Sequence, residues 1–324
     1  MQMTRRSMLA GAAMTFLAGP AFARDARVIG GRAFGSYWRC VLPGGADAGR
    51  AARGLRREFD RIDRALSPWR ADSAASLLNT APGGRWIETP PLLDTALREA
   101  EAAHDASGGG FDARLGPAVR RFGFGPIMGR VETGWFELRG DAARKSFGLL
   151  TFDACGLGKG LALDLAIAAL RREGCGQALL EIGGEVRAIG RHPSGRPWQI
   201  AVERPGGGVQ RLLQTGDLAL ATSGHAPNGV AELRLGHVID PRSGRPAEPR
   251  LAQVSVLAET GARADALATG LLALGPVAGP CQARKTGISA LFLLRREDGF
   301  REIVTGGFDA MPADREGLRW RSSL

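Results

Sequence analysis

The sequence has few cysteines and histidines, and this scarcity narrows the chemistry available to the chain. It has four cysteines, Cys40, Cys155, Cys175 and Cys281, and four histidines, and neither set shows a CxxC pair or the spacing of a zinc site. A disulfide is allowed in an oxidising compartment, but the sequence does not determine which cysteines would pair.

Lysine and long apolar runs are also scarce. Only three of the 43 basic residues are lysines, and the arginines are scattered through a chain of formal net charge +10 that is only 6% aromatic. A nucleic-acid-binding surface would instead show clustered basic residues with interleaved aromatic ones. The positive charge can still attract an anionic nucleotide. No apolar run reaches the length needed to span a bilayer.

The N-terminus has the order of an export signal. Arg5 and Arg6 precede the apolar run Leu9–Ala18, which is followed by the small-residue cleavage pattern Ala21-Phe22-Ala23. The paired arginines indicate the twin-arginine route. We therefore expect a cleaved signal peptide over residues 1–23 and a mature periplasmic chain over 24–324 without a stable membrane anchor.

Periodicity predicts a mixture of strands and helices. Apolar residues spaced by three and four predict helices, and β-rich or alternating stretches predict strands. The expected helices cover 55–66, 92–104, 161–170 and 264–274. The expected strands cover 27–42, as one strand or a hairpin, and 146–153, 178–182, 198–202, 218–222, 288–294 and 300–304. The order has no strict βαβ repeat, so we expect an α+β fold with mixed, mainly antiparallel sheets and packed helices.

The segment Ala264–Gly270 contains a pair of oxygen-bearing side chains at helical spacing. Asp265 and Thr269 are four residues apart and project from the same helix face. A carboxylate and a hydroxyl in this arrangement are hard ligands suited to Mg²⁺. The same pair on a solvated helix face would be without function, and the spacing alone does not decide between the two readings.

A glycine-rich stretch over Asp153–Gly160 is predicted to join a strand to a helix. Closely spaced glycines let the backbone approach a ligand, and a helix N-terminus attracts phosphate. Lys159 adds a positive charge there, which favours anion binding over a purely structural turn. The stretch lacks the spacing of a P-loop and of a dinucleotide-binding turn.

Two further segments allow both a structural and a functional reading. Gly183-Gly184-Glu185 is either a tight bend at the end of a strand or a backbone surface laid against a ligand. His237 precedes the turn around Asp240-Pro241, and it is either a packing residue or a group that transfers protons near neutral pH.

Taken in order, these motifs resemble the FAD:protein FMN transferase family, also called ApbE-like flavin transferases, over nearly all of the mature region. The motifs that carry the resemblance are Gly35-Ser36-Tyr37-Trp38, Leu66–Trp69, Asp72-Ser73, Leu78-Asn79, Gly110-Phe111-Asp112, Gly116-Pro117, Phe122–Gly125, Asp153–Gly160, Ile182–Glu185, Pro197-Trp198, Ala221–Gly224, His237–Pro246 and Ala264–Gly270. Each is common alone, but the ordered set is specific.

The resemblance implies a fold, a reaction and a set of site residues. The fold would be ApbE-like and related to the T-fold, as one domain or as two subdomains around an FAD cleft. The reaction would cleave the pyrophosphate of FAD with Mg²⁺, or Mn²⁺ in its place, transfer FMN to a Thr or Ser hydroxyl of a partner flavoprotein, and release AMP. By position, the implied metal ligands are Gly156, Asp265 and Thr269, the FAD-contacting residues are Phe34, Trp69, Phe111, Asp112, Asp153, Lys159 and Ala247, and the catalytic base is His237.

This sequence departs from the family pattern at two positions. His225-Ala226 and a short loop follow Gly224 where a tyrosine is common, and Ala268 stands where some relatives have an additional acid. Fewer protein ligands would then leave water or phosphate oxygens to complete the metal shell. Two alternatives from other classes stay open: a periplasmic FAD-binding protein, and a Mg²⁺-dependent FAD pyrophosphatase without a protein acceptor. The sequence fixes neither the acceptor protein nor the oligomeric state.

Overall fold

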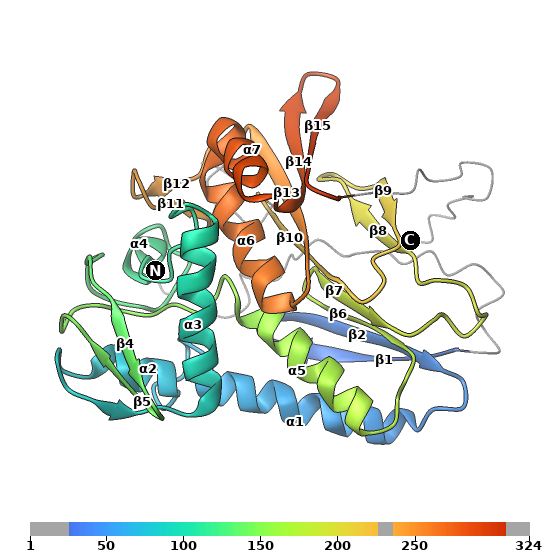
Figure 1. Cartoon of the computed structure of the whole chain (residues 1–324), viewed down its shortest axis with the longest axis horizontal. Coiled ribbons are helices and arrows are strands. Elements are labelled where there is room, and N and C mark those ends of the chain that lie inside the picture. Colours follow the sequence, from blue (N-terminus) through green and yellow to red (C-terminus); the bar gives the residue numbers. More distant parts are fainter. Residues whose placement is uncertain (1–25, 226–235, 309–324) are drawn as a thin grey trace.

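A computed structural model of the chain describes residues 26–225 and 236–308, and its centre is one antiparallel sheet (Figure 1). The signal peptide expected over residues 1–23, and most of the loop after Gly224, lie outside the described residues. The sheet has eight strands in the order β1-β2-β6-β7-β10-β13-β14-β15, and every neighbouring pair is antiparallel. These strands are β1 (Ala26–Ala33), β2 (Ser36–Pro43), β6 (Ala178–Ile182), β7 (Glu185–Ile189), β10 (Ala219–Gly224), β13 (Leu251–Ala258), β14 (Ser289–Arg296) and β15 (Gly299–Thr305).

Helices cover one face of this sheet. The alternation of side chains along each strand directs one set, such as Trp38, Leu180 and Val256, into the main hydrophobic core beneath the helices. In Figure 1, α5 and α6 lie across the sheet, α1 runs beside α5, and α3 lies beside α6. Helix α1 also packs on the sheet, since the Phe59 ring lies 5.5 Å from that of Trp38. The helices are α1 (Ala48–Leu66), α2 (Ala74–Thr80), α3 (Pro91–Ala106), α4 (Gly116–Arg121), α5 (Gly158–Arg172), α6 (Gly261–Ala273) and α7 (Gly275–Thr286).

The opposite face of the sheet has a smaller core. The alternate strand residues, such as Leu179, Val186 and Leu220, pack there with Trp198 and Ile200. The hairpin of β8 (Ile200–Glu203) and β9 (Val209–Leu213) supplies part of this cover. Two other small sheets complete the described part, made of β3 (Ile87–Glu88), β5 (Ala142–Lys145) and β4 (Phe136–Arg139), and of β11 (Ile239–Asp240) and β12 (Arg245–Pro246).

The α+β class with mainly antiparallel sheets is confirmed, and local signals explain several element boundaries. Helix α1 begins where the Asp47 side chain accepts a hydrogen bond from the Arg50 amide, and it ends before Ser67, which precedes a proline. The predicted C-terminal hairpin is also correct, since β14 and β15 pair across the turn before Gly299. Each of these features depends on a short stretch of sequence.

The strand expected over residues 146–153 is absent. The extended backbone at Phe152 bonds to a side chain instead of a neighbouring strand. Asn79 Oδ1 accepts a hydrogen bond from the Phe152 amide at 2.7 Å, and Asn79 Nδ2 donates to the Phe152 carbonyl at 2.9 Å. The fully buried Lys145 ammonium donates to the carbonyls of Asn79 and Gly148. The Asn79 side chain therefore makes the hydrogen bonds that a neighbouring strand would otherwise make. These bonds hold the segment that leads to Asp153, although it belongs to no sheet.

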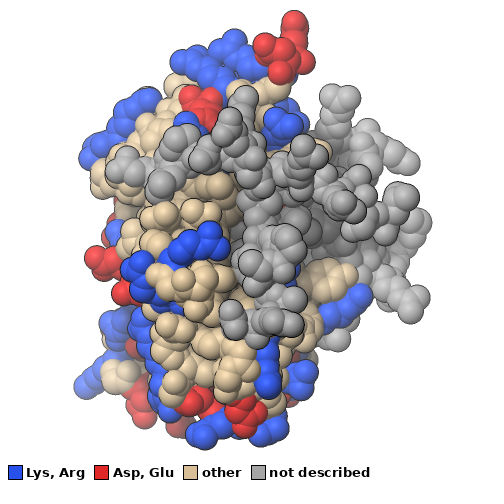
Figure 2. Space-filling view, turned by 90° about the vertical axis from the view of Figure 1, so that its right-hand side faces the viewer, with Lys and Arg blue, Asp and Glu red and all other residues tan. Residues whose placement is uncertain are grey.

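The structure contains no disulfide among the four cysteines, and its basic residues are dispersed over the face shown in Figure 2. All four cysteines are free, and only Cys40 is buried. Lys and Arg side chains lie at several separate places on the face in Figure 2 and do not form one patch. No helix within residues 26–225 and 236–308 has the length and apolar character that crossing a membrane requires.

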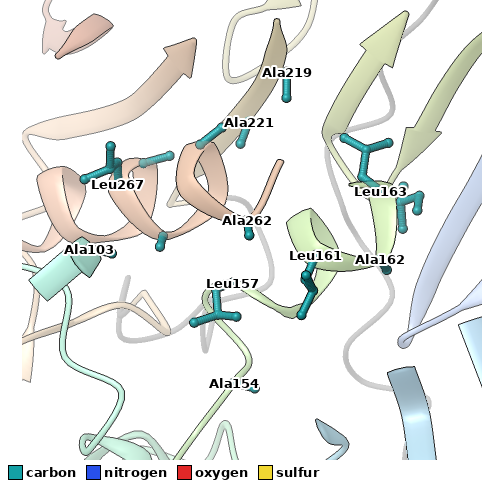
Figure 3. Packing of buried hydrophobic residues seen from close by; sticks show 14 of the residues in the cluster. Ala103, Ala154, Leu157, Leu161, Ala162, Leu163, Ala219, Ala221, Ala262 and Leu267 are labelled. Carbon is teal, nitrogen blue, oxygen red and sulfur yellow. The ribbon is translucent and has the colours of Figure 1, made fainter. Parts of the chain in front are cut away.

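Helices α5 and α6 approach each other most closely at their N-terminal ends. A Cβ on Gly160 would lie 2.1 Å from the Gly261 carbonyl oxygen, and a Cβ on Gly261 would lie 2.4 Å from the Gly160 carbonyl oxygen. Small core side chains such as Ala162, Ala221 and Ala262 pack in this region (Figure 3). Only glycine permits backbones to approach this closely, and the approach brings polar residues of both helices together.

Candidate functional site

The candidate site lies at one end of the sheet, where two hairpin turns meet the N-terminus of α5. The β6–β7 turn consists of Gly183 and Gly184, with φ of 60° and 107°, between the paired residues Ile182 and Glu185. A Cβ on Gly183 would lie 2.7 Å from Ser36 Oγ and 3.3 Å from Lys159 Cδ. The tight turn therefore brings the end of the sheet close to Lys159. The segment is the tight bend that one of its two interpretations predicted, and it lies beside the candidate site.

Lys159 is held by two buried carboxylates from different elements. Its Nζ lies 2.8 Å from Glu185 Oε1 and 3.5 Å from Asp265 Oδ1. The side chains of Glu185 and Asp265 are each 2% exposed, whereas that of Lys159 is 27% exposed. The ammonium is therefore tied down at its inner side and reaches solvent at its outer side.

The charges of this cluster do not balance. Burial alone would lower the pKa of Lys159, but Asp265 and Glu185 outweigh burial and raise it, so the lysine stays charged. One ammonium faces two carboxyl groups, and burial raises the pKa of Glu185 to about 8 and also raises that of Asp265, so protonation removes part of the negative charge near neutral pH. A cation bound beside Asp265 would favour the ionised form of both carboxyl groups.

The three predicted metal ligands lie close together. Asp265 Oδ2 accepts a hydrogen bond from the Gly160 amide at 3.1 Å and so caps α5, while Oδ1 lies toward Lys159. Thr269 Oγ1 is 3.1 Å from Ser223 Oγ, and it would lie 3.6 Å from a Cβ on Gly156. The Asp265 carboxylate, the Thr269 hydroxyl and the Gly156 carbonyl all offer oxygen atoms, and Mg²⁺ prefers oxygen ligands.

The surroundings of this pair differ from a solvated helix face. Asp265 is 2% exposed because α6 is packed on almost every side, so that alternative reading is wrong for Asp265. No group of three or more His, Cys, Asp or Glu side chains able to hold a metal occurs in the described part of the chain. Asp265 is the one carboxylate in the predicted ligand set, and water or ligand oxygens would have to complete the shell.

Asp153 begins the loop that leads into α5. Its amide donates to the Ala113 carbonyl at 2.7 Å, and its Oδ1 accepts from the Cys155 amide at 3.0 Å. Burial raises the pKa of Asp153. The carboxylate thus shapes the turn before Gly156, and the loop joins an extended segment, not a strand, to the helix.

His237 lies near this cluster at the start of the β11–β12 segment. It is solvent-exposed, its ring meets Phe124 edge-on at 6.1 Å, and the Ala247 amide beside it donates to the Val238 carbonyl. The surrounding protein atoms, the Lys159 ammonium and His225 lower the pKa of His237. A neutral imidazole at physiological pH can accept a proton.

The structure separates the residues predicted to contact FAD into exposed and buried ones. Trp69 is 43% exposed in the α1–α2 turn, whereas Phe111 is 3% exposed and packs against Gly156 and Gly270. The Phe111 ring therefore supports the metal-ligand loop, and stacking on a flavin would require it to become accessible. Asp112 accepts a 2.6 Å bond from Arg114 Nε.

Two other predicted contact positions lie at the margins of the site. Phe34 has a positive φ of 52° in the β1–β2 turn and packs edge-on against Phe59 at 5.6 Å. A non-glycine residue in this conformation is uncommon and costs energy, so the turn is held by its surroundings. Ala247 is buried beneath the segment that carries His237.

Three residues of the site did not stand out individually in the sequence. Glu185 bonds Lys159, Ser223 bonds Thr269, and Asn79 fixes the strand-like segment before Asp153. Their partners are 26, 46 and 73 residues away, so no local spacing points to them. The one available signal for Glu185 was an acid directly after a paired-glycine turn.

Comparison with known proteins gives a consistent result. The ApbE family model matches residues 34–292. The FAD:protein FMN transferase of Vibrio cholerae is 31% identical over 82% of this chain and 86% of its own length, and that of Escherichia coli K12 is 30% identical over 88% and 89%.

Solved structures show the same relationship. The flavin transferase ApbE from Vibrio cholerae superposes with a TM-score of 0.77 at 29% identity, over 87% of this chain and 98% of that one. The apo flavinyl transferase ApbE of Pseudomonas stutzeri gives 0.78 at 30% identity, over 88% and 96%. The family-model match, the curated relatives and the solved structures together show that this chain belongs to the ApbE family.

Proposed function

We propose that this chain is an FAD:protein FMN transferase that cleaves FAD with Mg²⁺ and attaches FMN to a Thr or Ser hydroxyl of a partner flavoprotein, with release of AMP. The observation that carries the proposal is the buried cluster of Lys159, Asp265 and Glu185 beside Thr269 and Gly156. It combines a positive charge at a helix N-terminus with hard oxygen ligands, which is what a nucleotide pyrophosphate and its metal require. Relatives that carry this activity in their names support it.

In the proposed mechanism, the residues of this chain bind, orient and move a proton. The Lys159 ammonium, at the positive N-terminal end of α5, would bind the FAD phosphates. A divalent cation held by Asp265, Thr269 and the Gly156 carbonyl would neutralise charge on the pyrophosphate oxygens. Mn²⁺, which also takes oxygen ligands, could replace Mg²⁺.

His237 is the proposed base for the acceptor hydroxyl. The hydroxyl oxygen forms a bond to the phosphorus of the FMN half, its proton passes to His237, and the bond from that phosphorus to the AMP oxygen breaks. General-base help of this kind contributes about 10²–10⁴-fold to a rate. The lowered pKa of His237 keeps the ring unprotonated and ready at neutral pH.

One assay separates this function from the two alternatives. Purified protein is incubated with FAD, Mg²⁺ and a candidate flavoprotein domain, and the products are analysed by mass spectrometry. A covalent FMN adduct together with AMP supports the transferase. Free FMN and AMP without an adduct would identify a pyrophosphatase, and intact bound FAD would identify a binding protein.

The metal requirement is tested separately. We expect Asp265→Ala to abolish transfer because it removes the one carboxylate in the ligand set. EDTA should give the same loss, restored by Mg²⁺ or Mn²⁺. Circular dichroism must show that the variant is folded, since Asp265 also caps α5. A folded Asp265→Ala protein with full activity would rule out this ligand.

We also propose that the enzyme acts in the periplasm. The support is the export pattern over residues 1–23, in which Arg5 and Arg6 precede a short apolar run. An FMN acceptor in that compartment would then be the partner.

A further inference from the structure

Glu185 is a buried acid for which the proposed reaction has no use, and one of its oxygens lacks a partner. Oε1 accepts the 2.8 Å bond from Lys159, while Oε2 is buried without a hydrogen bond from any residue that the structure describes. A buried unpaired carboxylate oxygen is costly. Such a group is retained where its charge or its position is needed.

The two distances at Lys159 show what Glu185 does to the ammonium. Lys159 Nζ is within hydrogen-bonding distance of Glu185 Oε1 at 2.8 Å but stands 3.5 Å from Asp265 Oδ1. Asp265 Oδ2 is already engaged by the Gly160 amide. Oδ1 is therefore the Asp265 oxygen left for a cation, and the lysine is its nearest competitor.

The fold holds Glu185 in this position with little freedom. Glu185 is the first residue of β7, it pairs with Ile182 across the Gly183-Gly184 turn, and it is 1% exposed. Gly183 brings the turn within 3.3 Å of the Lys159 side chain at the position of an added Cβ. The Glu185 carboxylate is thus positioned beside Lys159 by a paired strand of the sheet.

We propose that Glu185 is a positioning residue that holds the Lys159 ammonium away from Asp265, so that Asp265 Oδ1 stays available to a divalent cation. This inference rests on the metal site of the proposed function. Without the Glu185 charge, Lys159 has one buried anion left to pair with, and that anion is the metal ligand. An ammonium bonded to Asp265 would repel a cation and occupy its oxygen.

The test measures Mn²⁺ binding in the absence of FAD and acceptor, by the electron paramagnetic resonance signal of free Mn²⁺. Four proteins form a cycle: the wild type, Glu185→Gln, Lys159→Met and the double variant. Glu185→Gln keeps the size of the side chain and removes its charge. We expect it to weaken Mn²⁺ binding about tenfold or more, the scale of a neighbouring charge moved by a few ångströms.

The Lys159→Met background separates positioning from simple charge. With no ammonium to hold, Glu185→Gln should change Mn²⁺ affinity by less than about twofold, so the cycle shows strong coupling between the two residues. Equal weakening in both backgrounds would mean that Glu185 acts through its charge alone, which would overturn the proposal. Equal Mn²⁺ affinity of the wild type and Glu185→Gln would overturn it as well.

Glu185→Asp keeps the proposal testable if Glu185→Gln does not fold. Aspartate retains the charge but is one methylene too short to hold Lys159 at 2.8 Å. We expect this variant also to bind Mn²⁺ more weakly, and wild-type affinity would contradict the positioning role. A wild-type protein that binds no Mn²⁺ would instead overturn the metal assignment itself, so the two failures are distinguishable.

Discussion

The approach of α5 to α6 gives a sharp prediction for Gly160→Ala. The added Cβ would lie 2.1 Å from the Gly261 carbonyl oxygen, 2.4 Å from its carbon and 2.7 Å from the Ala262 nitrogen. All three atoms are backbone and cannot rotate away. Ordinary contact begins near 3.4 Å, so one helix end must move by more than about 1 Å.

Two costs add in this variant. Overpacking of a close contact costs about 1–3 kcal/mol. The same shift pulls the Gly160 amide from Asp265 Oδ2, a 3.1 Å bond, and leaving a buried donor unpaired costs about 1–3 kcal/mol more. We therefore expect the free energy of unfolding to fall by about 2–5 kcal/mol.

Urea denaturation followed by circular dichroism measures this change, and Gly158→Ala is the matched control. Gly158 lies two residues earlier in the same helix turn, and no atom lies within 4 Å of its added Cβ. Alanine there should be neutral or stabilising by up to about 1 kcal/mol. If the two variants unfold within about 0.5 kcal/mol of each other, the close helix contact is not as described.

Four further predictions concern His237, the hydrogen bonds of Asn79 with Phe152, and export. NMR titration of His237 should give a pKa below its ordinary 6.5, because the folded protein disfavours the charged imidazole. The contribution of neutral His237 to stability is therefore fully present above pH 6.5 and is lost as the pH falls toward the pKa of the folded state. A measured pKa at or above 6.5 would contradict the environment described for His237. His237→Asn should leave FAD affinity by calorimetry unchanged while single-turnover transfer falls about 10²-fold or more; weak FAD binding or a wild-type rate would remove His237 as the base. Asn79→Ala should lower the free energy of unfolding by about 2–4 kcal/mol because it leaves the Phe152 amide and carbonyl unpaired; a loss below about 0.5 kcal/mol would show that water replaces the side chain. Replacement of Arg5 and Arg6 by lysine should leave a precursor in the cytoplasm, detected by fractionation and mass spectrometry, and a full-length unprocessed protein in the periplasm would refute the signal.

Much of the fold was predictable because its signals are local. The 55–66 and 92–104 helices have the right period and end at a proline and at glycines, and the final hairpin is marked by its turn residues. The strand expected over 146–153 failed because β-rich composition does not specify a hydrogen-bonding partner. Asn79 supplies that partner from 73 residues away.

The sequence identified candidate site residues but did not show how the structure holds them. Helical spacing placed Asp265 and Thr269 on one face, but no periodicity reveals that α6 is buried almost all round and that Asp265 caps another helix. Glu185 was visible only as an acid after two glycines. The contact between Glu185 and Lys159 forms only because the β6–β7 hairpin packs against the start of α5. Such tertiary packing cannot be read from local sequence patterns.

The pairing of β2 with β6 has a consequence for how the protein acquires activity. Trp38 pairs with Ile182, and the Lys159 cluster is completed by Asp265, so the site draws on both ends of the described chain. Contacts between residues this far apart form late, because long segments must first be ordered. A chain cut before α6 lacks Asp265 and therefore lacks the Lys159 cluster at which we propose that FAD binds. On this proposal, activity requires that segments far apart in the sequence have already come together.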